Sequence, residues 1–386
     1  MKQPWLSAAL GFLLFPATLL AQDAHGPAIG GATTAAPMEL FGLYWNPALL
    51  AMPEGNGSPT WSVGSGFSAF DTSNIGSPIL QFNSQNASQS TQNPVQRSQQ
   101  YLGLFGVKYM GMAGGIVYDQ ELNYLSSQGA IAFFRDQKAG SPSSTSPYAL
   151  NYQQTTQQIS NVMLSYSTPL PIGTVSLFSV GASLKYHVGL QYQQTTLTGT
   201  YQSGNSANTN YQYTRVSSTS GLGYSVDAGF FAKLTDSVQA GMMFQNLNSS
   251  FNWQAQQQSL TLDQTTGAET AGTPSNITVA APFPYTTKLG LVLAPPDKNT
   301  LLEGEISWVQ QQTHWRFGLE QFNPNTFFVL RLGTFFDDIS NSQLWTFGLG
   351  YDKPNFNIDL SLTTRSLPDV TTSITLGGGL DAVVRF

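Results

Sequence analysis

Apolar and polar residues alternate one by one through the C-terminal segment of the chain. Its apolar positions are Ile374, Leu376, Leu380, Ala382, Val384 and Phe386. Its polar and small positions are Thr375, Gly377, Gly379, Asp381 and Arg385. A period of two residues predicts a β-strand with one apolar face and one polar face. A transmembrane β-barrel has this pattern, because each strand turns one face to lipid and the other to the lumen.

The alternation recurs in six earlier segments, at 178–192, 222–230, 288–293, 315–320, 328–333 and 345–351. One such segment would fit the edge of a soluble sheet, whereas a series indicates a barrel. The whole chain predicts an all-β fold, a transmembrane antiparallel β-barrel of about fourteen strands. The expected strands lie at 60–70, 101–109, 112–134, 158–167, 175–194, 213–232, 237–252, 285–294, 300–309, 314–321, 326–336, 343–352, 355–364 and 373–386. The third run is interrupted around 121–128, where we expect a kink or break.

The connections between these strands alternate between long and short. The expected external loops are 71–100, 135–157, 195–212, 253–284, 310–313, 337–342 and 365–372. Outer-membrane barrels have short periplasmic turns and longer external loops, so the alternation supports an even count. Five tryptophans near predicted strand ends suit the membrane interface, and they are Trp61, Trp253, Trp308, Trp315 and Trp345. The alternative is that they are core residues of a soluble sandwich.

Composition agrees with a barrel. Charged residues make up 9% of the chain, against about 25% in ordinary soluble domains. No segment after the N-terminus has a run of roughly 18 apolar residues, the length of a membrane-spanning helix. The net charge of −6 argues against nucleic acid as a partner, since nucleic-acid binding needs clustered Lys and Arg. Without any cysteine, the fold must rest on a closed hydrogen-bonded sheet.

The N-terminus predicts three regions. Lys2, the apolar run 6–20 and Ala21 are typical of a secretory signal peptide, residues 1–21. Export without a spanning helix indicates the outer membrane of a Gram-negative-type bacterium, with its lipids as surroundings. Residues 22–58 are too apolar for the periplasm, so we expect a hatch that plugs the lumen. Residues 59–386 form the barrel.

Short motifs carry a resemblance to a known family. The opening Gly30-Gly31 and the turn Asn46-Pro47-Ala48, just before the first strand, resemble the hatch of the FadL-type long-chain fatty-acid channel superfamily. Segments of the C-terminal half are similar to its PorV-like branch, which is associated with type IX secretion; they lie at 227–231, 245–247, 318–320, 330–333 and 346–350. The terminal Phe386 resembles the signal that the barrel-assembly machinery reads. The resemblance implies that Asn46 lies at a hatch turn, where it either gates the lumen or only closes the turn.

Charged side chains on the polar face form a predicted lumen cluster. Its members are Lys185, His187, Asp227, Lys288, Glu303, Glu305, Arg316, Glu320 and Arg331. Ions in a narrow lumen need opposite partners, so an ion-pair ladder that braces wall and hatch is one interpretation. The other is a polar guide for an anionic headgroup near Lys288, Arg316 or Arg331.

A second set of lumen positions is apolar. Its members are Leu102, Leu104, Val117, Met163 and Met243. They predict either an amphipathic passage or packing against the hatch. The interrupted stretch Leu122–Gln128 would open the wall sideways into lipid if the FadL resemblance extends so far.

Enzymatic motifs are missing from the sequence. His25, His187 and His314 form no metal-ligand spacing, and we find no nucleophile elbow or phosphate-binding loop. We therefore predict no catalytic residue, no metal and no cofactor. The leading hypothesis is a channel for passive uptake of hydrophobic or amphipathic, fatty-acid-like small molecules. The alternatives are a PorV-like barrel that binds exported proteins and secretion components, and a structural barrel with a permanently closed hatch.

Overall fold

The computed structural model describes residues 25–29, 31–36, 39–52, 61–73, 95–140, 142, 145–172, 176–295, 299–309, 312–337, 342–365 and 374–386. Seventeen strands are found in these residues, and three of them (β6, β9 and β10) lie outside the ring of the barrel. The fourteen strands of the ring are β1 (Trp61–Ser73), β2 (Val95–Tyr109), β3 (Met112–Ser126), β4 (Tyr148–Leu170), β5 (Leu177–Tyr201), β7 (Gly221–Lys233), β8 (Val238–Leu262), β11 (Thr286–Leu293), β12 (Thr300–Val309), β13 (Gln312–Asn323), β14 (Phe328–Asp337), β15 (Ser342–Lys353), β16 (Phe356–Arg365) and β17 (Ile374–Arg385). The predicted antiparallel barrel of fourteen strands is confirmed.

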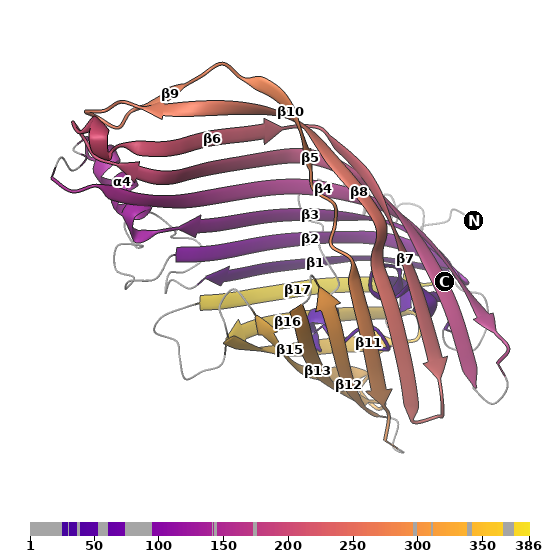
Figure 1. Ribbon diagram of the computed structural model, residues 1–386. Helices are drawn as coiled ribbons and strands as arrows, with labels where there is room; N and C mark the ends of the chain where they lie inside the picture. Colours follow the sequence, from indigo (N-terminus) through magenta and orange to yellow (C-terminus); the bar gives the residue numbers. More distant parts are fainter. Residues whose placement is uncertain are drawn as a thin grey trace, which may run out of the picture.

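Strand β1 closes the ring (Figure 1). It pairs antiparallel with β17 from Ser62↔Arg385 to Ser73↔Ile374. On its other side it meets β2 at Trp61↔Tyr109. A closed ring leaves no open sheet edge, which is the condition for placing a sheet in hydrocarbon.

The outer surface of the barrel is apolar. Leu184 and Leu330 are 53% and 60% exposed, whereas their neighbours Lys185 and Arg331 are buried on the lumen side. Transmembrane barrels present such an apolar band to lipid. None of the described helices is both long and apolar enough to cross a membrane.

The tryptophans follow the predicted pattern with one exception. Trp61, Trp308, Trp315 and Trp345 are exposed on the outward face. Trp253 is instead completely buried, where its ring stacks on that of Tyr192 at a centroid distance of 5.3 Å. The prediction of an interfacial position was therefore wrong for Trp253.

Three strands are much longer than a bilayer crossing requires. Strands β4, β5 and β8 have 23, 25 and 25 residues, while about 9–11 residues suffice to cross a bilayer. Together with β6 (Asn210–Ser218), β9 (Glu269–Ala271), β10 (Ser275–Ala280) and the helix α4 (Gln128–Lys138), their outer halves form a curved sheet that we call the extension (Figure 1).

The extension corrects the prediction of loops at 135–157, 195–212 and 253–284. Each of these ranges contains strand residues. Stretches rich in Gln, Ser and Thr lack an apolar alternation, but ladder hydrogen bonds between neighbouring long strands do not require one. The predicted strand at 213–232 is likewise two strands, β6 and β7, separated by Thr219 and Ser220.

The predicted interruption at 121–128 is a change from strand to helix. Strand β3 pairs without a break with β2 and β4 as far as Ser126. Helix α4 then begins with Ser127 as its N-cap, whose hydroxyl accepts a hydrogen bond from the Ala130 amide at 3.2 Å. The continuous ladder corrects the expectation of a kink, and it supplies no opening of the wall at Leu122–Gln128.

A β-bulge reverses the faces of β5. The pairing with β4 shifts register at Gln158/Ile159, opposite Leu190. An extra residue in one strand turns all later side chains to the other face. Tyr192, predicted to share the lipid face with Leu184, is therefore buried on the inner side.

Candidate functional site

The N-terminal segment lies against the inner wall of the barrel. Its described part contains α2 (His25–Ala28), η1 (Glu39–Phe41), α3 (Gly42–Trp45) and η2 (Pro47–Ala51). The apolar side chains of this segment are almost fully buried, among them Ile29, Leu40, Leu43, Leu49 and Leu50. Gly30 lies outside the described residues.

Two glycines in the barrel wall allow the N-terminal segment to lie directly against the backbone of the strands. A Cβ on Gly181 of β5 would lie 2.4 Å from the carbonyl carbon of Pro47. A Cβ on Gly229 of β7 would lie 2.0 Å from the Asn46 amide oxygen. Neither position has room for a side chain, so the fit between segment and wall depends on glycine there.

Asn46 joins three parts of the structure. Its side-chain amide donates to the Thr34 carbonyl at 2.7 Å and to the Phe230 carbonyl of β7 at 3.2 Å. Its side-chain oxygen accepts from the Ala48 amide at 3.1 Å and so caps η2. The Ala48 carbonyl accepts from the hydroxyls of Ser167 and Ser179. The turn is thus both a helix cap and a tether to the wall.

Glu305 on β12 holds the segment at a second place, three strands away from β7 in the ring. Its Oε2 accepts from the amides of Thr33 and Thr34, both at 3.1 Å, and from the Thr34 hydroxyl at 2.7 Å. Its Oε1 accepts from Arg316 Nη1 at 2.9 Å. Arg316 also packs over Gly31, where a Cβ would lie 3.1 Å from the arginine Cδ.

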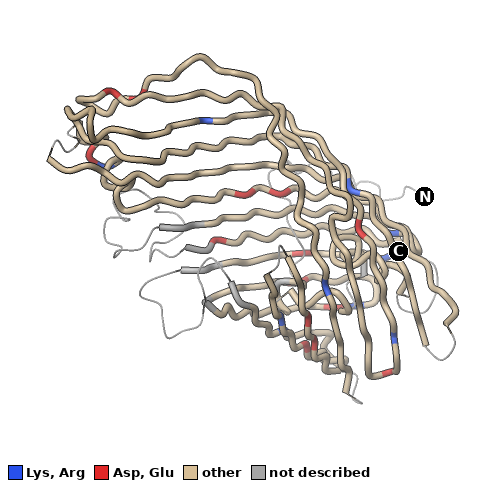
Figure 2. Tube along the Cα trace, in the orientation of Figure 1, with Lys and Arg blue, Asp and Glu red and all other residues tan. Residues whose placement is uncertain are grey.

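The other members of the predicted lumen cluster also lie on the inner side. Lys185 and Asp227 form an ion pair at 2.6 Å on neighbouring strands. Lys288 Nζ lies 5.3 Å from the centroid of the Trp45 ring, a cation–π contact between wall and segment. Glu303 is 4% exposed. Figure 2 shows charged residues sparsely along the extension and more densely in the barrel.

A second ionic group forms around Arg331 on β14. Its Nε donates to Glu320 at 2.6 Å, and its Nη1 contacts Asp359. These three residues come from β13, β14 and β16, so the guanidinium joins three strands of the wall on their inner side. Lys185, Asp227, Lys288, Glu305, Arg316, Glu320 and Arg331 thus each contact an oppositely charged group or an aromatic ring. This favours a cluster that braces the wall and the N-terminal segment over one that guides anions through the lumen.

His187 belongs to a hydrogen-bonded group instead of an ion pair. Its Nδ1 lies 2.5 Å from the Asn161 side-chain oxygen, and its Nε2 lies 2.9 Å from the Ser225 hydroxyl. The Phe283 ring lies against the imidazole at a centroid distance of 4.2 Å. The side chain is therefore fixed within the wall.

The predicted apolar lumen residues are all buried. Leu104, Val117 and Met163 pack in one cluster with Leu40 and Leu43 of the segment. Leu102 borders a cavity, and Met243 is completely buried on β8. Phe386 lies at the other end of the chain, where its backbone pairs with that of Trp61 and its side chain is 67% exposed.

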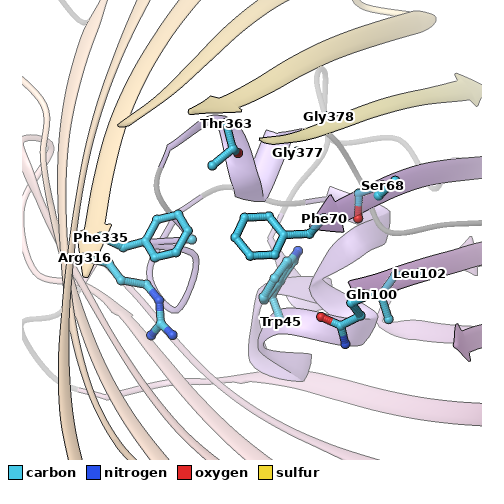
Figure 3. A pocket seen from close by; sticks show the side chains of 12 residues that line it. Trp45, Ser68, Phe70, Gln100, Leu102, Arg316, Phe335, Thr363, Gly377 and Gly378 are labelled. Atoms are coloured by element: carbon cyan, nitrogen blue, oxygen red, sulfur yellow. The ribbon is translucent and has the colours of Figure 1, made fainter. Parts of the chain in front are cut away.

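A cavity of about 270 Å³ lies between the segment and the wall. Its lining residues are Gly31, Trp45, Ser68, Ala69, Phe70, Gln100, Leu102, Arg316, Phe335, Thr363, Gly377 and Gly378. Figure 3 shows Phe70 and Phe335 pointing toward each other, with Trp45 beside Phe70 and Arg316 on the side of Phe335. The ring centroids of Phe70 and Phe335 are 6.4 Å apart at an angle of 41°.

Sequence reasoning did not select Phe70, Phe335 or Trp45 as site residues. A signal was present, since Phe335 is in phase with the polar-face residues Arg331 and Gly333 of its own strand. An aromatic ring on the lumen face is the exception in that pattern. Its partner Phe70 comes from a strand more than 250 positions away, at the far end of the sequence.

Comparison with known proteins places the fold. No protein-family model matches the chain, and no curated protein matches it in sequence. Solved structures do match it in shape. They include the toluene transporter TbuX of Ralstonia pickettii (TM-score 0.58, 13% identity, 96% of this chain and 99% of that chain) and the toluene transporter TodX of Pseudomonas putida (0.54, 14%, 95% and 98%). A FadL homologue of Pseudomonas aeruginosa matches at 0.51 with 11% identity, over 95% and 99%.

At these identities the matches establish a shared fold. The barrel fold that the resemblance to the FadL-type superfamily implies is thereby confirmed. The similarity to the PorV-like branch stays a prediction.

Proposed function

We propose that the protein is an outer-membrane channel for the passive uptake of hydrophobic or amphipathic small molecules. Residues 1–21 serve as the signal peptide, residues 22–58 as a hatch and residues 59–386 as the barrel. The described part of the hatch contacts both sides of the lumen. The proposal gains support from the fold shared with transporters of toluene and from the apolar outer band.

The cavity beside the hatch is the observation that carries the proposal. Its lining combines three aromatic rings with one guanidinium and a few hydroxyl and amide groups. Small-molecule sites are mostly apolar with a few placed polar groups. A ligand that enters from the extension would rest there, between Trp45 of the hatch and Phe335 of the wall.

Passage to the periplasm then requires the hatch to move. Hydrogen bonds at Asn46 and Glu305 hold the segment. Those that join it to the wall must break when the segment shifts. The polar guide for an anionic headgroup has less support, because Arg316 and Arg331 already have carboxylate partners. We assign the lumen cluster to bracing of wall and hatch.

A disulfide that locks the hatch tests the mechanism. A Cβ on Gly290 of β11 would lie 3.3 Å from the Ala35 Cβ and 2.9 Å from the Ala35 amide nitrogen. A small outward shift of the segment would therefore relieve this contact and bring the two Cβ atoms to the separation found in disulfides. The natural chain has no cysteine, so Ala35→Cys with Gly290→Cys gives one defined pair. Cells that produce the oxidised variant should take up labelled toluene and dodecanoate no faster than cells without the channel.

The reduced form of the pair should restore uptake, and Ala35→Cys alone is the matched control. Undiminished uptake through the fully oxidised pair would refute a moving hatch. Equal uptake by cells with and without the wild-type chain would refute the channel itself.

Assembly in the outer membrane is part of the proposal. Phe386 ends β17 at the strand that closes the ring. We infer that the barrel-assembly machinery reads this residue.

A further inference from the structure

The guanidinium of Arg316 has unused hydrogen-bond donors at the cavity. One nitrogen, Nη1, donates to Glu305 at 2.9 Å and to Ser307 at 2.7 Å. Within the described part of the chain, Nε and Nη2 make no hydrogen bond. The side chain is 25% exposed and borders the cavity. A ligand atom that accepts hydrogen bonds would satisfy these donors.

The charge of Arg316 is already balanced. Glu305 neutralises it directly. Arg316 and Glu305 together offer hydrogen-bond donors to the cavity without a net charge, which suits a neutral acceptor better than an anion.

Aromatic rings line the cavity. Phe70 and Phe335 lie against each other with ring centroids 6.4 Å apart, and the Trp45 ring lies beside Phe70 (Figure 3). Aromatic rings gain about 0.5–1.5 kcal/mol from stacked or edge-to-face partners beyond the burial of their area. A flexible alkyl chain gains no such term.

The volume of the cavity matches a ligand of one or two rings. Its volume is about 270 Å³, whereas an engineered cavity of about 150 Å³ is known to bind benzene. Pockets that enclose drug-sized ligands begin at about 300 Å³. A long acyl chain would extend beyond the three rings.

From these observations we infer that the channel prefers aromatic compounds of one or two rings that carry a neutral hydrogen-bond-accepting oxygen. The ring lies among Trp45, Phe70 and Phe335, and the oxygen accepts from Nε or Nη2 of Arg316. The inference rests on the proposed function and narrows its substrate class. It separates this protein from a channel for plain hydrocarbons and from one for long-chain fatty acids.

Binding to the purified full-length chain in detergent tests the preference. Four probes are compared by calorimetry: methyl benzoate, propylbenzene as a match in size without oxygen, benzoate as the anion, and dodecanoate as the acyl chain. Hydrogen bonds to charged groups contribute about 1.5–3 kcal/mol, and 1.4 kcal/mol corresponds to tenfold in affinity. Methyl benzoate should therefore bind at least about tenfold more tightly than propylbenzene, and more tightly than either anion.

Two variants locate the effect. Arg316→Lys retains the ion pair with Glu305 but lacks the planar fork of donors, so the preference for methyl benzoate over propylbenzene should largely disappear. Phe335→Leu should weaken both compounds alike by about threefold to tenfold. Phe317→Leu, on the outward face of the same strand as Arg316, is the matched control and should change neither affinity.

The results distinguish a failure of the substrate preference from a failure of the proposed channel function. Propylbenzene binding as tightly as methyl benzoate, or an unchanged preference in Arg316→Lys, would overturn the inference and leave the channel in place. Tighter binding of benzoate or dodecanoate would assign the site to anions and also overturn it. If none of the four probes binds, both the inference and the proposed function fall.

Discussion

Replacement of Asn46 by alanine should unfasten the hatch while leaving the barrel intact. The substitution removes three hydrogen bonds, to Thr34, Phe230 and Ala48. Thr34 and Ala48 belong to the hatch and move with it, so only the bond to Phe230 favours the closed position. At about 0.5–1.5 kcal/mol for a neutral bond, and because 1.4 kcal/mol is tenfold in an equilibrium constant, the population of the displaced hatch should rise roughly twofold to tenfold.

Conductance across planar lipid bilayers measures this population. Asn46→Ala should show more frequent or larger openings than the wild type. The barrel itself should keep its unfolding temperature, measured by the heat-dependent shift in gel mobility, because the ladders between strands are unchanged.

A matched variant separates capping from tethering. Asn205 caps η5 (Ser206–Asn208) in the extension with the same geometry, its side-chain oxygen accepting from the Ala207 amide at 3.1 Å. Asn205→Ala should lose a cap without affecting conductance. Asn46→Ser retains a capping oxygen but lacks the amide that reaches Phe230, so it should conduct like Asn46→Ala. Closed-state conductance in both Asn46 variants would refute the tether and reduce the residue to a turn former.

Four further outcomes are expected. Gly181→Ala should raise conductance as well, since its Cβ would collide with Pro47, whereas Gly304→Ala, whose nearest neighbour would be 3.9 Å away, should behave as wild type in the same bilayer assay. Lys185→Met leaves Asp227 buried without its ion-pair partner and should destabilise the barrel by about 3–5 kcal/mol in urea titrations, with Lys185→Met/Asp227→Leu recovering most of the loss. Burial, followed by the neighbouring Tyr124, raises the pKa of Tyr152 in the extension from 10.0 to about 12; the neutral phenol therefore stabilises the extension below pH 10, and this contribution is lost as the pH rises to about 12, which ultraviolet titration of tyrosine can follow. Deletion of Phe386 should lower the yield of heat-modifiable barrel in outer-membrane fractions, and normal insertion would count against its role in assembly.

The barrel was predictable from the sequence because each of its strands separates lipid from lumen. For example, Leu330 is exposed on the outer surface and the next residue, Arg331, is buried on the inner side. The extension leaves only a sparse record. Its buried apolar residues, among them Leu197, Tyr201 and Leu260, which cluster with Phe133 of α4, stand isolated among Gln, Ser and Thr. Stretches such as 193–200 in β5 therefore resemble loops, although long neighbouring strands hold them in a ladder.

The cavity was less predictable for a different reason. Its rings come from the hatch, from β1 and from β14, and the alternation of each strand fixes a face but not which faces meet. Phe335 and Phe70 become partners only through the closure of the ring between β17 and β1. The bulge at Leu190 similarly moves Tyr192 to the inner side, and no feature of the local sequence marks that extra residue.

Two kinds of contact hold the N-terminal segment, and under the proposed function the difference between them bears on how it moves. Leu40 and Leu43 pack on Leu104 and Met163 through dispersion contacts, which change gradually as surfaces slide. The amides of Thr33 and Thr34 bind Glu305 through hydrogen bonds, which weaken steeply with distance and angle. Displacement that begins at Thr33 and Thr34 frees one oxygen of Glu305, while the other oxygen still binds Arg316 at the cavity. Under the proposed function, ligand contact at Arg316 and release of the hatch would therefore act on the same carboxylate.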